Sequence, residues 1–213
     1  MAEQPASDVV LYRRVASRAF PVLWLLEELG LAYRDANLGR PNGPRPPELL
    51  DVSPAGYTPA LRDGETKVSE APAICLYLAD RYGYGELAPR VDDAARGPYL
   101  KWMVYSTAVL EPARELQLTT VTPVKNDWGL GWPTYELVVR QLADALAAGP
   151  WLLGERFTAA DVMLGSVLSI GLFCGSIPAE PALAAYDARL SARPANQRAR
   201  DLNWPPEMFG AGA

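Results

Sequence analysis

The stretch that decides the fold is Ser53-Pro-Ala-Gly-Tyr-Thr-Pro-Ala-Leu-Arg-Asp-Gly64, which leads into Ser69-Glu-Ala-Pro-Ala-Ile74. The turn residues Asp63-Gly64 lie between two short segments, so the sequence predicts a β-hairpin over residues 59–68. Apolar residues then recur at helical spacing over residues 72–82, which predicts an amphipathic helix directly after the hairpin.

The residues before this stretch predict a strand, a helix and a second strand. Residues 8–12 form a short apolar segment that is typical of a buried strand. Residues 19–29 place apolar side chains on one helical face, and Gly30 follows where the helix should stop. Residues 31–38 are a weaker strand candidate. The order of elements is therefore strand, helix, strand (βαβ), followed by a short helical turn, two strands and a helix ((α)ββα). Together these elements make a small α/β unit.

The residues after position 83 predict a different kind of structure. Residues 84–93 resemble a linker, and no convincing strand follows them. Apolar residues at helical spacing predict helices over residues 93–116 (bent at Pro112), 134–148, 159–173 and 181–190, and a short helix around 195–201. We therefore expect the α/β unit to be followed by an all-α unit.

Composition excludes several classes of function. The 213 residues are 49% hydrophobic and 21% charged, which excludes an intrinsically disordered chain. With 20 basic and 25 acidic residues and no basic run, a nucleic-acid or membrane-surface partner is not expected. The chain has no histidine, which excludes imidazole general bases, Ser-His-Asp triads and His-ligated zinc. Two cysteines cannot form a four-thiolate site, so we expect no metal.

Two segments of the sequence indicate where in the cell the protein is expected to be found. The first eight residues lack the basic start and apolar core of a signal peptide, so we expect a cytoplasmic protein. Residues 162–179 contain no charge, but their glycines, serines and Pro178 favour a buried core helix over a membrane span.

Three local patterns could carry chemistry. Thr58-Pro59 before a short strand is a plausible cis bond that would turn the Thr58 main chain outward to pair with another peptide. Glu70 and Ala71 open a helix, where free N–H groups favour a carboxylate and Glu70 could hold an ammonium group. Ser17 lies between a strand and a helix, where a hydroxyl can stabilise a thiolate. Each pattern taken alone is more often structural: a proline turn, a first-turn glutamate or an N-cap serine.

Thr158-Ala-Ala-Asp161 is the sharpest local pattern. It predicts a capping box at the start of the helix over residues 159–173, with Phe157 and Val162 as a hydrophobic staple. This device is structural.

The ordered set of motifs resembles the glutathione S-transferase family over nearly the full chain. The resemblance is carried by five segments: Leu11-Tyr12 with Ser17 and Leu26-Glu-Glu-Leu-Gly30, Ser53 to Leu61, Glu70 to Leu78, Phe157 to Asp161, and Tyr186 with Arg189 to Pro194. It implies a thioredoxin-like glutathione-binding domain over residues 7–83, a linker over 84–93 and an all-helical domain over 94–205. It also implies a homodimer.

Carried over residue by residue, the resemblance assigns the binding site. Ser17 matches the catalytic hydroxyl of the serine-type, bacterial-like cytosolic members, which hydrogen-bonds the glutathione thiolate. Thr58, before Pro59, matches the residue whose main chain pairs with the cysteinyl unit, and Glu70 matches the acidic residue at the γ-glutamyl end.

The sequence departs from the family pattern at three positions of this site. Ala71 stands where a serine is usual, so only its main-chain N–H remains. Tyr57 stands where a lysine is common. Arg18 follows Ser17 and could be the group that stabilises the thiolate, because a guanidinium is the stronger electrostatic partner.

The resemblance implies a detoxifying transferase that conjugates glutathione, as co-substrate, to small hydrophobic electrophiles. The expected electrophile pocket is lined by Tyr105, Leu110, Trp128 and Phe173, although plain core packing is an alternative for each. A non-catalytic binding or interaction module of the same fold, and another glutathione-dependent enzyme (isomerase, dehalogenase or peroxidase), stay open. Cys75 and Cys174 are both expected to be buried and inert, which disfavours thiol oxidoreductase chemistry.

Overall fold

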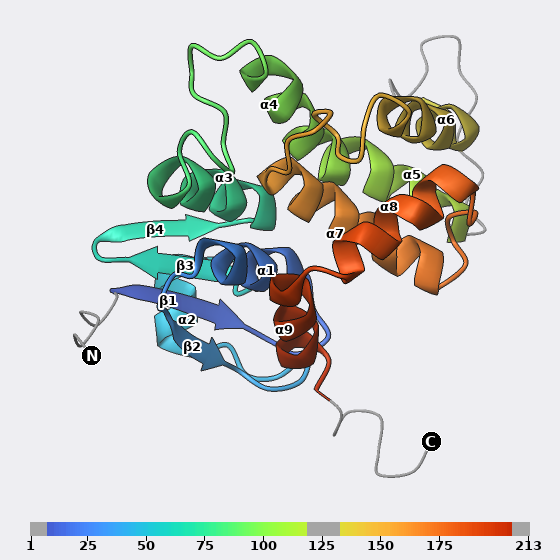
Figure 1. The fold of residues 1–213 in the computed structure, drawn as a ribbon. Helices are drawn as coiled ribbons and strands as arrows, with labels where there is room; N and C mark the ends of the chain where they lie inside the picture. The colour runs from blue at the N-terminus through green and yellow to red at the C-terminus, as the bar shows by residue number, and fades with distance from the viewer. Residues whose placement is uncertain (1–7, 119–132, 206–213) are drawn as a thin grey trace, which may run out of the picture. The chain divides into compact units, whose positions relative to one another are not determined.

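Unit 1 of the protein is built on a four-stranded sheet in the order β2-β1-β3-β4 (Figure 1). The computed structural model describes residues 8–118 and 133–205, and unit 1 holds the described parts of Met1–Gly83 and Ala192–Ala213. β1 pairs in parallel with β2 and antiparallel with β3, and β4 extends the sheet antiparallel to β3. The strands are β1 Val9–Arg13, β2 Arg34–Asn37, β3 Ala60–Asp63 and β4 Thr66–Ser69.

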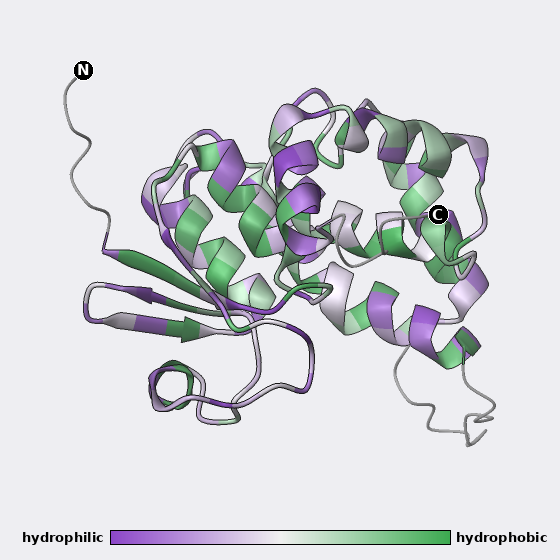
Figure 2. Ribbon diagram, turned by 90° about the horizontal axis from the view of Figure 1, so that it is seen from below, coloured by the Kyte–Doolittle hydropathy of each residue, from purple (hydrophilic) through white to green (hydrophobic). Residues whose placement is uncertain are grey.

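Helices cover both faces of this sheet. α1 and α3 lie on one face and α2 lies on the other (Figure 2). Val10 and Tyr12 of β1 pack with Leu49 and Val52 of α2, so the central strand is buried throughout. The helices are α1 Phe20–Leu29, α2 Pro47–Val52, α3 Ala71–Tyr82 and α9 Pro194–Asn203. The expected βαβ-(α)ββα unit is confirmed, and the α1 helix ends at Gly30, whose φ of 59° suits glycine.

The last helix, α9, packs with unit 1 rather than with the other helices that follow residue 83. This differs from the expected division, which assigned residues 94–205 to one helical domain. Two ion pairs join α9 and its N-cap to α1: Arg193 Nε lies 2.6 Å from Glu28 Oε1, and Arg198 Nε lies 2.6 Å from Glu27 Oε2. Contacts between residues this far apart in the chain leave no local pattern in the sequence.

Unit 2, Tyr84–Ser191, is helical in its described part. Its segments are α4 Arg96–Tyr105, a π-helical turn Ser106–Leu110, α5 Glu111–Leu118, α6 Tyr135–Leu146, α7 Ala159–Phe173 and α8 Pro181–Ser191. Most of α7 is buried, as the absence of charged residues after Asp161 predicts. Among the described residues, no helix is long and apolar enough to cross a bilayer.

The expected helix over residues 93–116 is interrupted by the π-helical turn just before Pro112. The Glu111 N–H donates to the Ser106 carbonyl, five residues back. Proline lacks an N–H and its ring crowds the carbonyl four residues earlier, so a widened turn accommodates Pro112 without breaking the helix.

Gly171 in α7 allows a close approach that a methyl group would block. A Cβ at this position would lie 2.6 Å from Ile177 Cγ1 and closer still to Cδ1 of the same buried side chain. We expect Gly171→Ala to lower the free energy of unfolding by about 1–3 kcal/mol, because the core must shift to accept the methyl. Gly97→Ala is the control, since a Cβ there meets no atom within 4 Å. Equal melting temperatures for the two variants would contradict this packing.

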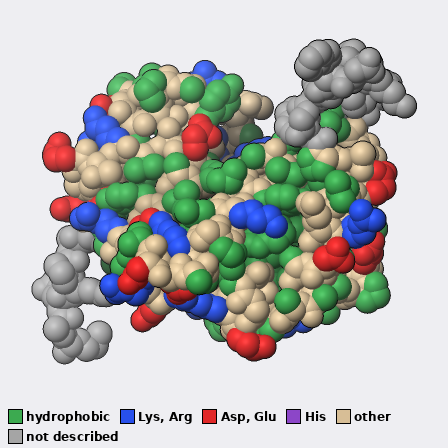
Figure 3. All heavy atoms as spheres, turned by 90° about the horizontal axis from the view of Figure 1, so that it is seen from above, with side chains coloured by type: hydrophobic (Ala, Val, Ile, Leu, Met, Phe, Trp, Pro, Cys, Tyr) green, Lys and Arg blue, Asp and Glu red, His purple; other side chains and the backbone are tan. Residues whose placement is uncertain are grey.

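Basic and acidic side chains are interspersed on the face shown in Figure 3. Among the described residues on that face, no extended basic area is present for a polyanion to bind.

Candidate functional site

The strand register brings three loop segments to one end of the sheet. Tyr12 of β1 lies opposite Ala60 of β3, and Ala60 lies opposite Ser69 of β4. The loop that carries Ser17 follows β1, the Thr58-Pro59 step precedes β3, and Glu70 follows β4. The three segments singled out in the sequence therefore meet at the same end of the sheet.

The Ser17 loop folds on itself before α1 begins. The Ser17 hydroxyl donates to the Arg14 carbonyl at 2.7 Å and accepts from the Ala19 N–H at 3.2 Å. Ser17 is half-buried, and its own N–H makes no hydrogen bond to another described residue. Because a hydroxyl has one proton, Ser17 must turn away from Arg14 before it can donate to a ligand.

Two arginines at the end of β1 hold the surrounding loops, and sequence reasoning did not assign them a role. Arg13 makes a bidentate pair with Asp35, at 2.8 and 2.6 Å. Arg14 donates to the carbonyls of Leu38, Arg40 and Pro44 and is only 7% exposed. An arginine directly after a buried strand needs hydrogen-bond partners inside the protein. This position in the sequence is the signal that could have identified Arg13 and Arg14 as residues that hold the loops. Arg18, in contrast, is exposed.

The Thr58-Pro59 bond is cis, as expected. Pro59 is buried, and the main chain of Thr58 makes no hydrogen bond to another described residue. Tyr57 is 67% exposed, with the Arg45 guanidinium 5.1 Å from its ring centroid. This segment therefore presents an unpaired peptide group beside an exposed aromatic ring and a cation.

Glu70 opens α3 with an unusual backbone conformation. Its φ is 72°, a region that residues other than glycine rarely adopt, and its side chain is exposed. Its carbonyl accepts the Ile74 N–H at 2.9 Å, and the Glu70 side chain does not cap the first N–H groups of α3. The turn thus combines an exposed carboxylate with an uncapped helix N-terminus, where a ligand carboxylate is favoured.

Comparison with known proteins identifies the family of the N-terminal part of the chain. Residues 7–80 match the family model for the glutathione S-transferase N-terminal domain. A solved glutathione S-transferase from Actinobacillus pleuropneumoniae is similar with a TM-score of 0.75 and 27% identity, over 92% of each chain. Residues 7–80 belong to the glutathione S-transferase N-terminal domain family. The fold class of the chain is correspondingly a thioredoxin-like domain with a helical remainder.

Other glutathione S-transferases show the same likeness at similar identity. Glutathione S-transferase 3 of Schizosaccharomyces pombe is 28% identical over 178 residues, which are 72% of this chain and 70% of that protein. Glutathione S-transferase GstA of Escherichia coli O157:H7 is 30% identical over 126 residues, 57% of this chain and 60% of that protein. The theta-class enzyme of Xanthomonas axonopodis pv. citri, solved with glutathione bound, is 29% identical with a TM-score of 0.69, over 91% of this chain and 97% of that chain.

The residues expected to line an electrophile pocket fall into different environments. The Tyr105 hydroxyl donates to Gln141 Oε1 at 2.7 Å, and Leu110 is fully buried in unit 2. Phe173, at the C-terminal end of α7, is 91% exposed. Trp128 lies outside the described residues. The burial of Leu110 fits core packing rather than contact with a ligand.

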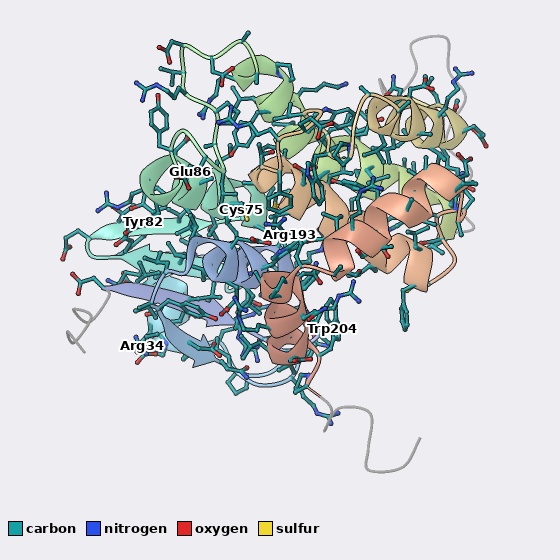
Figure 4. The ribbon with its side chains drawn as sticks, in the orientation of Figure 1. Arg34, Cys75, Tyr82, Glu86, Arg193 and Trp204 are labelled. Carbon is teal, nitrogen blue, oxygen red and sulfur yellow. The ribbon has the colours of Figure 1, made fainter. Side chains whose placement is uncertain are left out.

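The two cysteines differ from each other. Cys75 is buried in α3 (Figure 4), and this burial raises the pKa of its thiol, which fits the expected inert role. Cys174 is exposed, so the expectation that it is buried is wrong; it directly follows the last residue of α7, where the helix ends. Neither lies in the Ser17 loop.

Proposed function

We propose that the protein is a glutathione transferase that conjugates the glutathione thiolate to small apolar electrophiles. The observation that carries the proposal is the register Tyr12–Ala60–Ser69, which gathers the Ser17 loop, Thr58-Pro59 and Glu70-Ala71 at one end of the sheet. Glutathione is a short extended peptide with a carboxylate and an ammonium group at one end. These three segments offer it a main-chain partner, a helix N-terminus and an exposed carboxylate.

Each segment has a separate role in binding. The unpaired main chain of Thr58 would hydrogen-bond the cysteinyl unit as one strand pairs with another. The Glu70 carboxylate would hold the γ-glutamyl ammonium group, and the Ala71 N–H would meet the γ-glutamyl carboxylate. Tyr57 and Pro59 would border the cysteinyl unit.

The chemical step needs an ionised sulfur. Glutathione gives its thiol proton to solvent, and the Ser17 hydroxyl at the start of α1 stabilises the resulting thiolate, which lowers the thiol pKa. The sulfur then forms a bond to the electrophilic carbon. When the electrophile carries a leaving group, that group departs with the electron pair of the bond that breaks.

The remaining parts of the proposal follow the family resemblance. They are a cytoplasmic, detoxifying homodimer and an electrophile site bordered by Tyr105 and Phe173. Sedimentation of the purified protein and a panel of electrophiles test them.

A second candidate is a glutathione-binding module with little conjugating activity. The Ser17 proton already engages the Arg14 carbonyl, and a hydroxyl that stays in this arrangement cannot donate to sulfur. Binding of glutathione without turnover of any electrophile would favour this candidate.

Calorimetry with a charge-neutral variant tests the proposed binding mode. We expect glutathione to bind in the micromolar to millimolar range, about −4 to −8 kcal/mol. Glu70→Gln removes the charge that faces the ammonium group, so we expect about 10- to 100-fold weaker binding. Glu65→Gln, an exposed residue in the β3–β4 turn, is the control and should bind as the wild type does. Absence of heat and of thermal stabilisation at high glutathione concentration would leave only an interaction module.

A further inference from the structure

The C-terminal end of α9 holds the backbone on both sides of the Ser17 loop. The Asn203 carbonyl accepts the Ala16 N–H at 2.6 Å, and the Asn203 side-chain amide donates to the Ser17 carbonyl at 3.2 Å. One residue, 186 positions away in sequence, thus bonds to the chain before and after the Ser17 side chain. Arg13 Nη1 adds a bond to the Leu202 carbonyl at 3.0 Å.

We propose that Asn203 is a positioning residue that fixes the Ser17 loop in the conformation that stabilises the glutathione thiolate. The proposal rests on the function proposed above. Ala16 has a φ of 48°, which is disfavoured for alanine, so the loop needs external bonds to keep this shape. With the flanking peptide groups fixed by Asn203, the main chain of Ser17 keeps one direction, and its hydroxyl can turn from the Arg14 carbonyl toward the sulfur.

The hydrogen bonding of Asn203 indicates a positioning role rather than a stabilising one. The residue is fully buried, yet its side-chain oxygen has no partner among the described residues. A buried acceptor without a donor lowers stability, and a leucine, which has the same branched shape, would avoid that cost. An asparagine at this position therefore keeps one bond, to Ser17, at the expense of stability.

α9 is attached to α1 by contacts that do not involve Asn203. Arg193 and Arg198 pair with Glu28 and Glu27, and the Trp204 ring lies 4.9 Å from that of Phe20 (Figure 4). A substitution at Asn203 can therefore change the Ser17 loop while the helix stays in place. Arg198→Ala provides the matched control, because it removes one α9–α1 contact without touching the loop.

The experiment compares Asn203→Leu, Arg198→Ala and the wild-type chain. Amide hydrogen exchange of residues 14–19 and the ultraviolet absorbance of bound thiolate against pH are measured on the same samples. For Asn203→Leu we expect faster exchange in the loop, a bound-thiol pKa raised by about one unit and conjugation about tenfold slower below that pKa. The KM for glutathione and the melting temperature should change little. For Arg198→Ala, loop exchange and thiol pKa should match the wild type.

Two results would overturn the proposal. The first is an unchanged thiol pKa and unchanged loop exchange in Asn203→Leu; the second is an equal shift in Arg198→Ala, which would mean general loosening of α9. Failure of the proposed function has a different outcome, because the wild-type chain itself would then bind no glutathione or conjugate no electrophile. Loop exchange would still report on the Asn203 contacts in that case.

Discussion

Ser17→Ala should slow conjugation by about 10- to 1000-fold, the range expected for one preorganised hydrogen-bond donor. Glutathione affinity should change much less, because a hydroxyl bond to sulfur gains most of its strength when the sulfur is ionised. The measurements are kcat/KM with an aromatic electrophile and a calorimetric titration of glutathione. A loss in kcat/KM with a nearly unchanged affinity is the expected result.

The same variant has a structural effect that must be measured separately. The Ser17 hydroxyl also accepts the Ala19 N–H before α1, and losing such a bond typically costs about 0.5–2 kcal/mol. A thermal melt separates this loss from the loss of activity. Arg18→Ala is the chemical control: a near-normal Ser17→Ala beside an inactive Arg18→Ala would assign thiolate stabilisation to the exposed arginine.

Elements with local determinants could be predicted from the sequence. Gly30 ends α1, and the Thr158–Asp161 capping box is present as expected. The β3–β4 turn is formed by Gly64-Glu65, one residue after the predicted Asp63-Gly64, because Asp63 still pairs with Thr66. The order of these elements was enough to infer a small α/β unit, and the family resemblance supplied its thioredoxin-like fold. Each of these features depends on residues at most a few positions apart.

Contacts between distant residues could not be predicted in the same way. The packing of α9 with unit 1 and the bonds of Asn203 to the Ser17 loop join residues nearly the whole chain apart. The same holds for Arg14, whose three acceptors lie in a loop that has no hydrophobic pattern. The exposure of Cys174 depends on where α7 ends, and helix ends are poorly determined by periodicity alone.

The capping box of α7 belongs to a larger buried network than its sequence indicates. Asp161 Oδ2 accepts the Thr158 N–H at 2.8 Å, and Oδ1 accepts the Leu152 N–H at 2.9 Å and the Tyr186 hydroxyl at 2.8 Å. Burial raises the pKa of Asp161, and these hydrogen bonds oppose part of the rise. Burial likewise raises the pKa of Tyr186. The Asp161 carboxylate therefore joins the start of α7 to Tyr186 in α8 and to Leu152 in the segment that precedes α7.

Asp161→Ala should be far more damaging than an ordinary cap substitution. From the sequence alone, losing the capping-box hydrogen bond between the Asp161 side chain and the Thr158 N–H should lower the free energy of unfolding by about 1–2 kcal/mol. In the structure, however, the substitution would leave several buried donors without an acceptor. Each unpaired donor costs about 1–3 kcal/mol, so we expect the free energy of unfolding to fall by about 3–5 kcal/mol in total. For a chain of this size that corresponds to a melting temperature lower by roughly 10 °C. Thr134→Ala, which removes the exposed cap of α6, should cost only about 0.5–1 kcal/mol.

Glutathione affinity of the folded Asp161→Ala protein should stay almost unchanged, because all proposed glutathione contacts lie in unit 1 and Asp161 lies in unit 2. Asp161→Asn distinguishes the effect of lost hydrogen bonds from that of lost side-chain volume. Asparagine keeps the shape of aspartate and one acceptor oxygen, but its NH2 group replaces the second oxygen and faces other donors. It should fall between Asp161→Ala and the wild type in melting temperature. A thermal melt and a glutathione titration on one sample decide the matter. Normal stability with lost binding would place Asp161 at the ligand and contradict the assignment of the network to folding.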